Sequence, residues 1–228
     1  MAKSKIAYVC SDCGSDHSKW QGQCVDCGAW NTLTEVKLAA SPQAAREAKF
    51  QGYAGAANNQ QVQTLDQINL EALPRIPSGA LEFDRVLGGG LVHGSAILIG
   101  GHPGAGKSTL LLQTMCHLAK SMDALYVTGE ESLQQVAMRA QRLGLPTDKL
   151  KMLSETNVEA ICIQAEKLKP RILVVDSIQV VHSDDVTSAP GSVSQVRECA
   201  AYLTRYAKQT GTVLFLVGHV TKDGSLAG

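Results

Sequence analysis

The sequence predicts an α/β fold with a mostly parallel sheet, preceded by a small zinc-finger module. Three observations carry this prediction. Apolar, strand-like runs alternate with helical stretches from residue 96 onward, a glycine-rich segment follows the first of these runs, and four cysteines lie near the amino terminus in two CxxC pairs. Such alternation is typical of a parallel sheet that is covered by helices on both faces.

The overall charge of the chain is balanced. Its 228 residues carry 21 Lys and Arg against 21 Asp and Glu. A neutral chain has no overall field that attracts nucleic acid or an anionic membrane, so any such binding depends on a local surface. No apolar run is long enough to cross a bilayer, and the first residues lack the apolar stretch of a secretory signal. We therefore expect a cytoplasmic protein with no membrane partner, whose cysteines are metal ligands and buried thiols.

The four amino-terminal cysteines form two matched pairs, Cys10-x-x-Cys13 and Cys24-x-x-Cys27. A glycine follows each pair and accepts the positive φ of a tight turn, and two such turns place four sulfurs around one Zn²⁺. Two redox-active dithiols are the alternative, but a second matched pair so close by favours structural zinc. His17 lies between the pairs, and we interpret it as a solvated loop histidine rather than a ligand.

The composition divides the chain into three predicted parts. Residues 1–36 form the zinc finger, and residues 37–63, which are rich in Ala, Gln and Asn with little periodicity, form a flexible linker. Residues 64–228 form the core domain. Within it, an apolar-acidic segment at 81–87 precedes three glycines at 88–90, which predict a turn that leads into the first core strand.

A complete phosphate-binding loop follows the apolar run at 96–99, because residues 101–108 read Gly-His-Pro-Gly-Ala-Gly-Lys-Ser. The glycines let backbone N–H groups curl around phosphates, Lys107 reaches the outer two, and Ser108 offers its hydroxyl to Mg²⁺. A plain glycine turn is the alternative, which the order of strand, loop and helix at 109–120 disfavours. The residues expected to bind the nucleotide are Gly101, His102, Pro103, Gly104, Ala105, Gly106, Lys107, Ser108 and Thr109.

Further strands and helices alternate after this loop. We predict strands at 124–128, 150–153, 172–176 and 213–217, and helices at 132–143, 158–168 and 193–208. The three remaining cysteines fall on predicted helices, and we interpret them as small buried hydrophobes: Cys116, Cys162 and Cys199. In an open parallel sheet the ligand binds beyond the carboxyl ends of the strands, so polar residues there are the candidates for chemistry.

Carboxylates follow two of these strands. Asp176 ends an apolar strand, as expected of a group that holds the water shell of Mg²⁺ beside a phosphate loop, although a helix cap is the alternative. Glu130 and Glu131 follow the strand at 124–128. Glu130 is the better candidate to orient and deprotonate the attacking water, whereas an acidic first turn of the next helix is the alternative for both.

Three more polar residues are candidates for contacts with the nucleotide. His219 follows the last strand and could sense the γ-phosphate, and Gln179 could do similar work after Asp176. Either side chain could instead satisfy a local backbone group. Arg139, on the helix after Glu130, could stack on the base, or it could be solvated or paired.

With these motifs the chain resembles the bacterial RadA (Sms) family of RecA-type recombination ATPases. The resemblance covers the finger and the segments 78–79, 87–90, 101–109, 126–132, 173–179 and 218–222. It implies a RecA-like core in which the strands, numbered along the chain, lie in the order 3-2-4-5-1. That order brings Lys107, Glu130, Asp176 and His219 to one edge, where Lys107, Glu130 and His219 would act in catalysis.

The resemblance also implies a function. Such proteins are ATP-driven DNA motors that form homo-oligomeric rings, use ATP, Mg²⁺ and Zn²⁺, and act with a RecA-type recombinase on single-stranded DNA during recombination and repair. The family's DNA-contacting loops correspond to residues 182–195, which we expect to be mobile, and to the segment from His219. The acidic pair Asp184-Asp185 does not suit a surface that grips phosphates.

Two alternatives come from other classes of function. One is a KaiC-type, RecA-like ATPase that switches a protein complex, and the other is a finger that docks a protein with the ATPase as its scaffold. Against the family pattern, we also expect the chain to be either a fragment of a longer protein or a truncated protein, because it ends before the Lys-Asn-Arg-Phe-Gly motif and the Lon-like domain. We therefore expect nucleotide binding to survive better than ring assembly.

Overall fold

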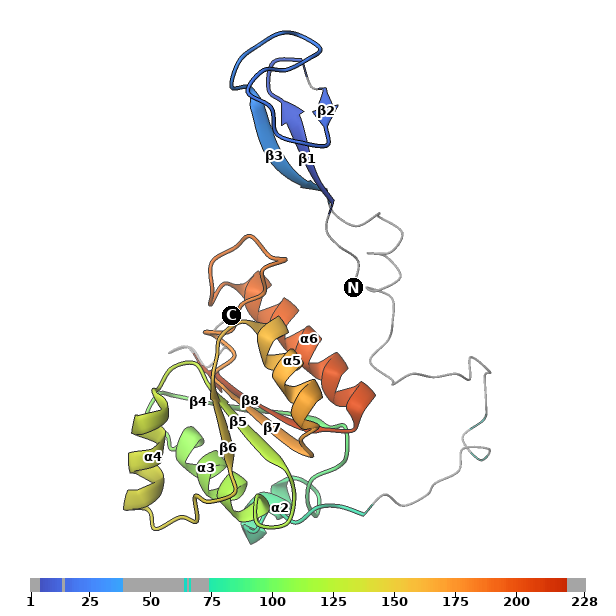
Figure 1. Ribbon diagram of the computed structural model, residues 1–228. Helices are drawn as coiled ribbons and strands as arrows, with labels where there is room; N and C mark the ends of the chain where they lie inside the picture. Colours follow the sequence, from blue (N-terminus) through green and yellow to red (C-terminus); the bar gives the residue numbers. More distant parts are fainter. Residues whose placement is uncertain (1–4, 14, 39–63, 65, 67–73, 221–228) are drawn as a thin grey trace. The chain divides into compact units, whose positions relative to one another are not determined.

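The computed structural model describes residues 5–13, 15–38, 64, 66 and 74–220, in two compact units (Figure 1). One unit lies within residues 1–52 and the other within residues 53–228. The predicted linker at 37–63 lies outside the described residues, apart from Lys37 and Leu38 at the end of a strand. The boundaries of the three predicted parts therefore stay predictions.

The amino-terminal unit is a three-stranded antiparallel sheet in the order β2-β1-β3. Its strands are β1 (Lys5–Cys10), β2 (Asp16–His17) and β3 (Leu33–Leu38). β1 pairs along its length with β3, so that Cys10 lies opposite Leu33, and Tyr8 of β1 lies opposite His17. Cys10, Cys24 and Leu33 are the buried apolar residues of this unit, with Tyr8 packed against them. So small a core supplies little stability by itself.

The second unit is a parallel sheet of five strands with helices on both faces (Figure 1). Its elements in chain order are α2 (Leu81–Val86), β4 (Ala96–Gly101), α3 (Lys107–Leu118), β5 (Ala124–Thr128), α4 (Leu133–Arg142), β6 (Lys151–Ser154), α5 (Val158–Leu168), β7 (Ile172–Asp176), α6 (Val193–Thr210) and β8 (Val213–His219). The strand order is β4-β8-β7-β5-β6. This is the predicted order 3-2-4-5-1 read from the other edge, so the α/β prediction and the order implied by the resemblance are confirmed.

Two apolar layers hold the helices against the sheet. Alternate residues of the central strands face opposite layers, as the period of a strand requires. Tyr126, Val174 and Phe215 pack with α3 and α4, whereas Val127 and Val175 pack with α5 and α6. Cys116, Cys162 and Cys199 are all buried in these layers, as predicted.

Side-chain caps explain where three helices begin. α4, α5 and α6 follow Ser132, Asn157 and Ser192, and each of these side chains accepts a hydrogen bond from a backbone N–H of the first turn. β5, α5 and β7 have the predicted bounds, and the other predicted core elements shift by one or two residues at one or both ends. None of the helices in the described part of the chain is long and apolar enough to span a membrane.

Candidate functional site

The carboxyl ends of four parallel strands, β4, β8, β7 and β5, lie at the same end of the sheet. Because β4 and β8 are parallel and in register, Gly101 lies beside His219. β5 and β7 are also in register, so Thr128 lies beside Asp176, and the backbone N–H of Gly129 donates to the Asp176 carbonyl at 2.9 Å. The phosphate loop after β4 and the polar residues after β5, β7 and β8 are therefore neighbours.

The phosphate loop leaves the start of α3 open to an anion. The helix begins at Lys107 after Gly106, which has a left-handed φ of 89° and provides no side-chain cap. The first turn also contains no acidic residue. Unlike the capped helices of this unit, α3 therefore keeps its first N–H groups and its positive dipole end for a ligand. A side chain added at Gly104 or Gly106 would meet nothing within 4 Å, so the positive φ alone favours glycine there.

Lys107 lies across the mouth of the loop. Its ammonium donates to the carbonyl oxygens of Gly101 at 2.7 Å and His102 at 2.9 Å, and it lies 3.5 Å from Nδ1 of His219. An ammonium has only donors, so Nδ1 of His219 accepts and Nε2 carries the proton. Lys107 is buried among carbonyl oxygens, which suits a residue that exchanges carbonyl partners for phosphate oxygens.

Glu130 receives two hydrogen bonds on one oxygen. Nε2 of His219 donates to Oε1 of Glu130 at 2.9 Å, and the hydroxyl of Ser177 donates to the same oxygen. His219 therefore bridges Lys107 and Glu130 across the edge of the sheet. The Glu130 side chain keeps a third of its surface exposed, so water reaches the carboxylate.

Asp176 is buried beside Glu130 and is fixed by a tyrosine. The hydroxyl of Tyr126 donates to Oδ2 of Asp176 at 2.5 Å. Burial, and then the charge of Asp176, raises the pKa of Tyr126, so the phenol stays protonated and remains a donor. A carboxylate has about four acceptor positions, so this bond leaves Asp176 able to hold a metal-bound water. Oxygen ligands from Ser108 and Asp176 are the kind that Mg²⁺ prefers.

Glu131 and Arg139 pair with each other. The guanidinium of Arg139 donates to the Glu131 carboxylate, and the Thr128 hydroxyl donates to the Glu131 backbone carbonyl at 2.8 Å. This is the paired arginine that the sequence left open as an alternative, and base stacking by Arg139 stays a prediction. Gln179 is half-buried in the turn after Ser177, and its role also stays a prediction.

The segment after β7 is tied to the start of α6. The buried amide of Gln195 donates to the backbone carbonyls of Ser183, Val186 and Ser188 at 2.9–3.2 Å, and its oxygen accepts from the Ser183 N–H at 3.0 Å. Asp184 and its neighbour Asp185 are exposed. The expected mobility of 182–195 and its contact with DNA remain predictions.

The four amino-terminal cysteines form one cluster. The Sγ atoms of Cys10 and Cys27 are 3.7 Å apart, and those of Cys13 and Cys24 are 3.6 Å apart. Zn–S bonds of about 2.3 Å in a tetrahedron require S–S distances of about 3.8 Å, so the cluster fits zinc. The pKa of Cys10 is lowered to about 6, first by its hydrogen bond with the Thr32 side chain and then by one with the backbone of Cys13. The lowered pKa favours the thiolate, which is the form that metals bind.

His17 is wrongly predicted as a solvated loop histidine. It lies in β2 with 9% of its side chain exposed, and its Nε2 is 3.5 Å from Sγ of Cys24 and 3.6 Å from Oδ2 of Asp26. Pairing of β2 with β1 brings His17, which lies between the two CxxC pairs, beside Cys24, and the sequence spacing does not reveal this.

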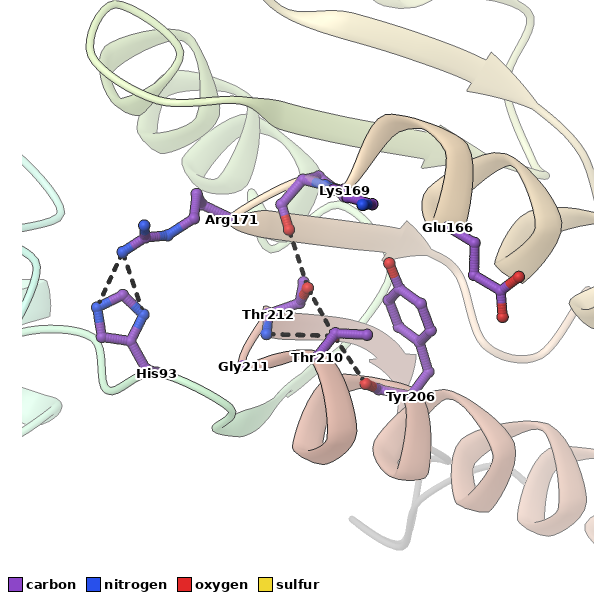
Figure 2. Close-up of a pocket in the computed structure, with 9 residues that line it drawn as sticks. His93, Glu166, Lys169, Arg171, Tyr206, Thr210, Gly211 and Thr212 are labelled. Carbon is purple, nitrogen blue, oxygen red and sulfur yellow. Dashed lines mark hydrogen bonds between the residues drawn. The ribbon is translucent and has the colours of Figure 1, made fainter. Parts of the chain in front are cut away.

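A large cavity lies at the opposite end of the sheet, where Arg171 and Thr212 precede β7 and β8 (Figure 2). It has a volume of about 760 Å³ and is lined by His93, Glu166, Lys169, Pro170, Arg171, Tyr206, Thr210, Gly211 and Thr212. Lys169 and Gly211 end α5 and α6, so the partially negative ends of both helices face this region.

Sequence reasoning missed two residues of the site, Tyr126 and Ser177. Each is buried, and each hydrogen-bonds a carboxylate that comes from a neighbouring strand or the loop after it. The position of Ser177 directly after Asp176 was the available signal for one of them. No local pattern marks Tyr126 as different from the other apolar residues of β5.

Comparisons with known proteins match both units. The model of the AAA domain family matches residues 82–225, and that of the rubredoxin metal binding domain matches residues 8–35. The chain is 67% identical over 229 residues to the DNA repair protein RadA of Escherichia coli (strain K12) and 66% identical to that of Haemophilus influenzae. It is 48% identical to the DNA repair protein RadA of Bacillus subtilis (strain 168). These alignments cover 100% of this chain and 49–50% of each relative, so the chain spans about half the length of the curated relatives it matches.

Proposed function

Because this chain belongs to the AAA domain family and its resemblance to the RadA family holds over its full length, we propose that it is the ATPase part of a DNA motor. The motor would be a helicase or branch-migration enzyme that acts on single-stranded DNA during homologous recombination and repair. A homo-oligomeric ring and a RecA-type recombinase as partner belong to the same proposal. This proposal rests on one observation: at the carboxyl ends of the strands, four polar residues lie together, namely Lys107, His219, Glu130 and Asp176.

Each of these residues has a task in hydrolysis. Mg²⁺, when bound, supplies positive charge beside the phosphates. Ser108 and Asp176 would hold the metal and its water shell, and Lys107 would exchange the carbonyls of Gly101 and His102 for phosphate oxygens. Glu130 accepts a proton from the attacking water, as a general base at hydrogen-bonding distance does.

The same contacts supply a route from nucleotide to DNA. When Lys107 turns to the phosphates, Nδ1 of His219 loses its donor, and the bond between His219 and Glu130 is free to change. His219 is the last residue of β8, and the segment that follows it is one of the proposed DNA contacts. A change at this position is the kind of local event that orders or releases a loop.

ATP turnover with and without single-stranded DNA tests the motor. The measurement compares this chain with a chain of the relatives' full length, and Lys107→Ala is the control for turnover that does not depend on the phosphate loop. We expect DNA to stimulate turnover by the longer chain. A longer chain that is folded and hydrolyses ATP but gains nothing from DNA would count against a motor.

A second candidate function rests on the surface of the zinc-finger unit. Trp20, Val25 and Trp30 are each more than half exposed, and exposed aromatic residues of this kind are frequent at protein interfaces. They favour the KaiC-type alternative, in which the zinc finger binds a protein complex and the ATPase switches that complex between states. Removal of residues 1–36 distinguishes the two, because intact DNA-stimulated turnover without the finger would weaken the docking function.

A further inference from the structure

Ser177 lies at the centre of the proposed ATPase site, although the predicted roles do not include it. It follows Asp176 directly, and it is fully buried. Its hydroxyl donates to Oε1 of Glu130, and Glu130 lies in the loop after the neighbouring strand β5. A buried hydroxyl that donates to a carboxylate makes a strong, charge-assisted hydrogen bond.

The backbone on both sides of Ser177 is fixed to other strands. The carbonyl of Asp176 accepts from the Gly129 N–H at 2.9 Å, and the Ile178 N–H donates to the carbonyl of Val217 at 2.9 Å. The hydroxyl is thus attached to the sheet, not to a free loop. Glu130 itself follows the end of β5, so its carboxylate depends on side-chain partners for its position.

The two donors to Glu130 differ in what else they contact. His219 lies 3.5 Å from Lys107, whose ammonium changes partners when phosphate binds. The hydroxyl of Ser177 contacts Glu130 without a link to Lys107. Both donors bond to Oε1, and among the described residues no hydrogen bond is recorded to Oε2. The two donors therefore fix Oε1 and leave Oε2 as the oxygen available to another partner.

We propose that Ser177 is a positioning residue that holds Oε1 of Glu130 so that Oε2 accepts the proton of the attacking water. The water proton moves to Oε2, the water oxygen bonds to the γ-phosphorus, and the bond from that phosphorus to the leaving diphosphate breaks. The Ser177 hydroxyl keeps its proton throughout. This inference rests on the proposed role of Glu130 and adds the residue that orients it.

The test separates kcat from KM for ATP in four variants of a chain of the relatives' full length. Ser177→Ala removes the donor, Ser177→Cys keeps the size with a weak donor, and Ser177→Thr keeps the hydroxyl. Thr212→Val is the matched control, because the Thr212 hydroxyl is also buried and donates to the Pro170 carbonyl at 2.9 Å, at the opposite edge of the sheet.

We expect Ser177→Ala to lower kcat about 10- to 100-fold, as misplacement of a reacting group by about 1 Å does, with KM within about twofold of wild type. Ser177→Cys should lie between wild type and Ser177→Ala, and Ser177→Thr should recover most of kcat. Thr212→Val should keep the wild-type kcat. Equal losses in Ser177→Ala and Ser177→Thr, or wild-type kcat in Ser177→Ala, would overturn the positioning role.

A double-mutant cycle with Glu130→Gln distinguishes positioning from a structural role. If Ser177 acts through Glu130, Ser177→Ala costs no further kcat in the Glu130→Gln background. Multiplied losses in the double variant would overturn the inference alone. Wild-type turnover in Glu130→Gln would overturn the proposed role of Glu130 and the inference with it.

Discussion

The bond between Tyr126 and Asp176 makes the most specific stability prediction. Tyr126→Phe keeps the ring, which is 1% exposed, and removes only the hydroxyl that donates to Oδ2 of Asp176 at 2.5 Å. A hydrogen bond to a charged group contributes about 1.5–3 kcal/mol to stability. Asp176 is 7% exposed, so water compensates the lost donor only in part. We therefore expect the variant to lose about 2 kcal/mol of unfolding free energy.

Thermal unfolding followed by circular dichroism measures this loss. In a domain of 150–250 residues, each kcal/mol shifts the midpoint by about 2–4 °C, so we expect a decrease of about 4–8 °C. Tyr202→Phe, which removes a hydroxyl from a half-buried ring on α6, is the control and should shift it much less. A midpoint for Tyr126→Phe within about 1 °C of wild type would refute the contribution assigned to this bond.

Three further predictions concern the role of Glu130, the zinc ligands, and the loss of stability at low pH. Glu130→Gln should bind ATP as wild type does but slow its cleavage, and equilibrium binding with single-turnover kinetics separates these effects, because a loss of binding would point to a structural role. Chelation of zinc or Cys10→Ser should unfold the amino-terminal unit and leave the midpoint of the core unchanged in calorimetry, whereas cooperative loss of both would contradict their independence. The N–H groups of Asn157 and then Thr156 lower the pKa of Glu155, so its contribution is full above the ordinary value of 4.5 and disappears as the pH falls through the lowered value. Urea unfolding of wild type and Glu155→Gln should therefore differ at pH 6 and converge in acid, and a constant difference would disprove this linkage.

Local patterns were sufficient to predict the elements that position the site. The strand at 172–176 and the helix at 158–168 have the predicted bounds, because apolar runs and caps mark their ends in the sequence itself. The phosphate loop is equally local, since its spacing fixes its backbone. Strand order is not local, and the chain's own residues did not reveal it. It came from the family resemblance, and the observed sheet confirms it.

Contacts between strands were harder to predict. Tyr126 meets Asp176 only because β5 and β7 pair in one particular register, and Ser177 meets Glu130 for the same reason. His17 was misinterpreted because the return of β2 along β1 buries it beside Cys24. Each of these contacts depends on the relative position of segments that are distant in the sequence, which hydrophobic periodicity does not encode.

The central claim is that the loop at 101–108 binds a nucleoside triphosphate through Lys107 and the open start of α3. Isothermal calorimetry of this chain with ATP and Mg²⁺ tests it directly, with Lys120→Ala as the control for loss of an exposed lysine on the same stretch of chain. We predict one ATP per chain for wild type and Lys120→Ala, and affinity at least about tenfold weaker for Lys107→Ala. No binding by folded wild-type protein, or equal binding by Lys107→Ala, would contradict the claim.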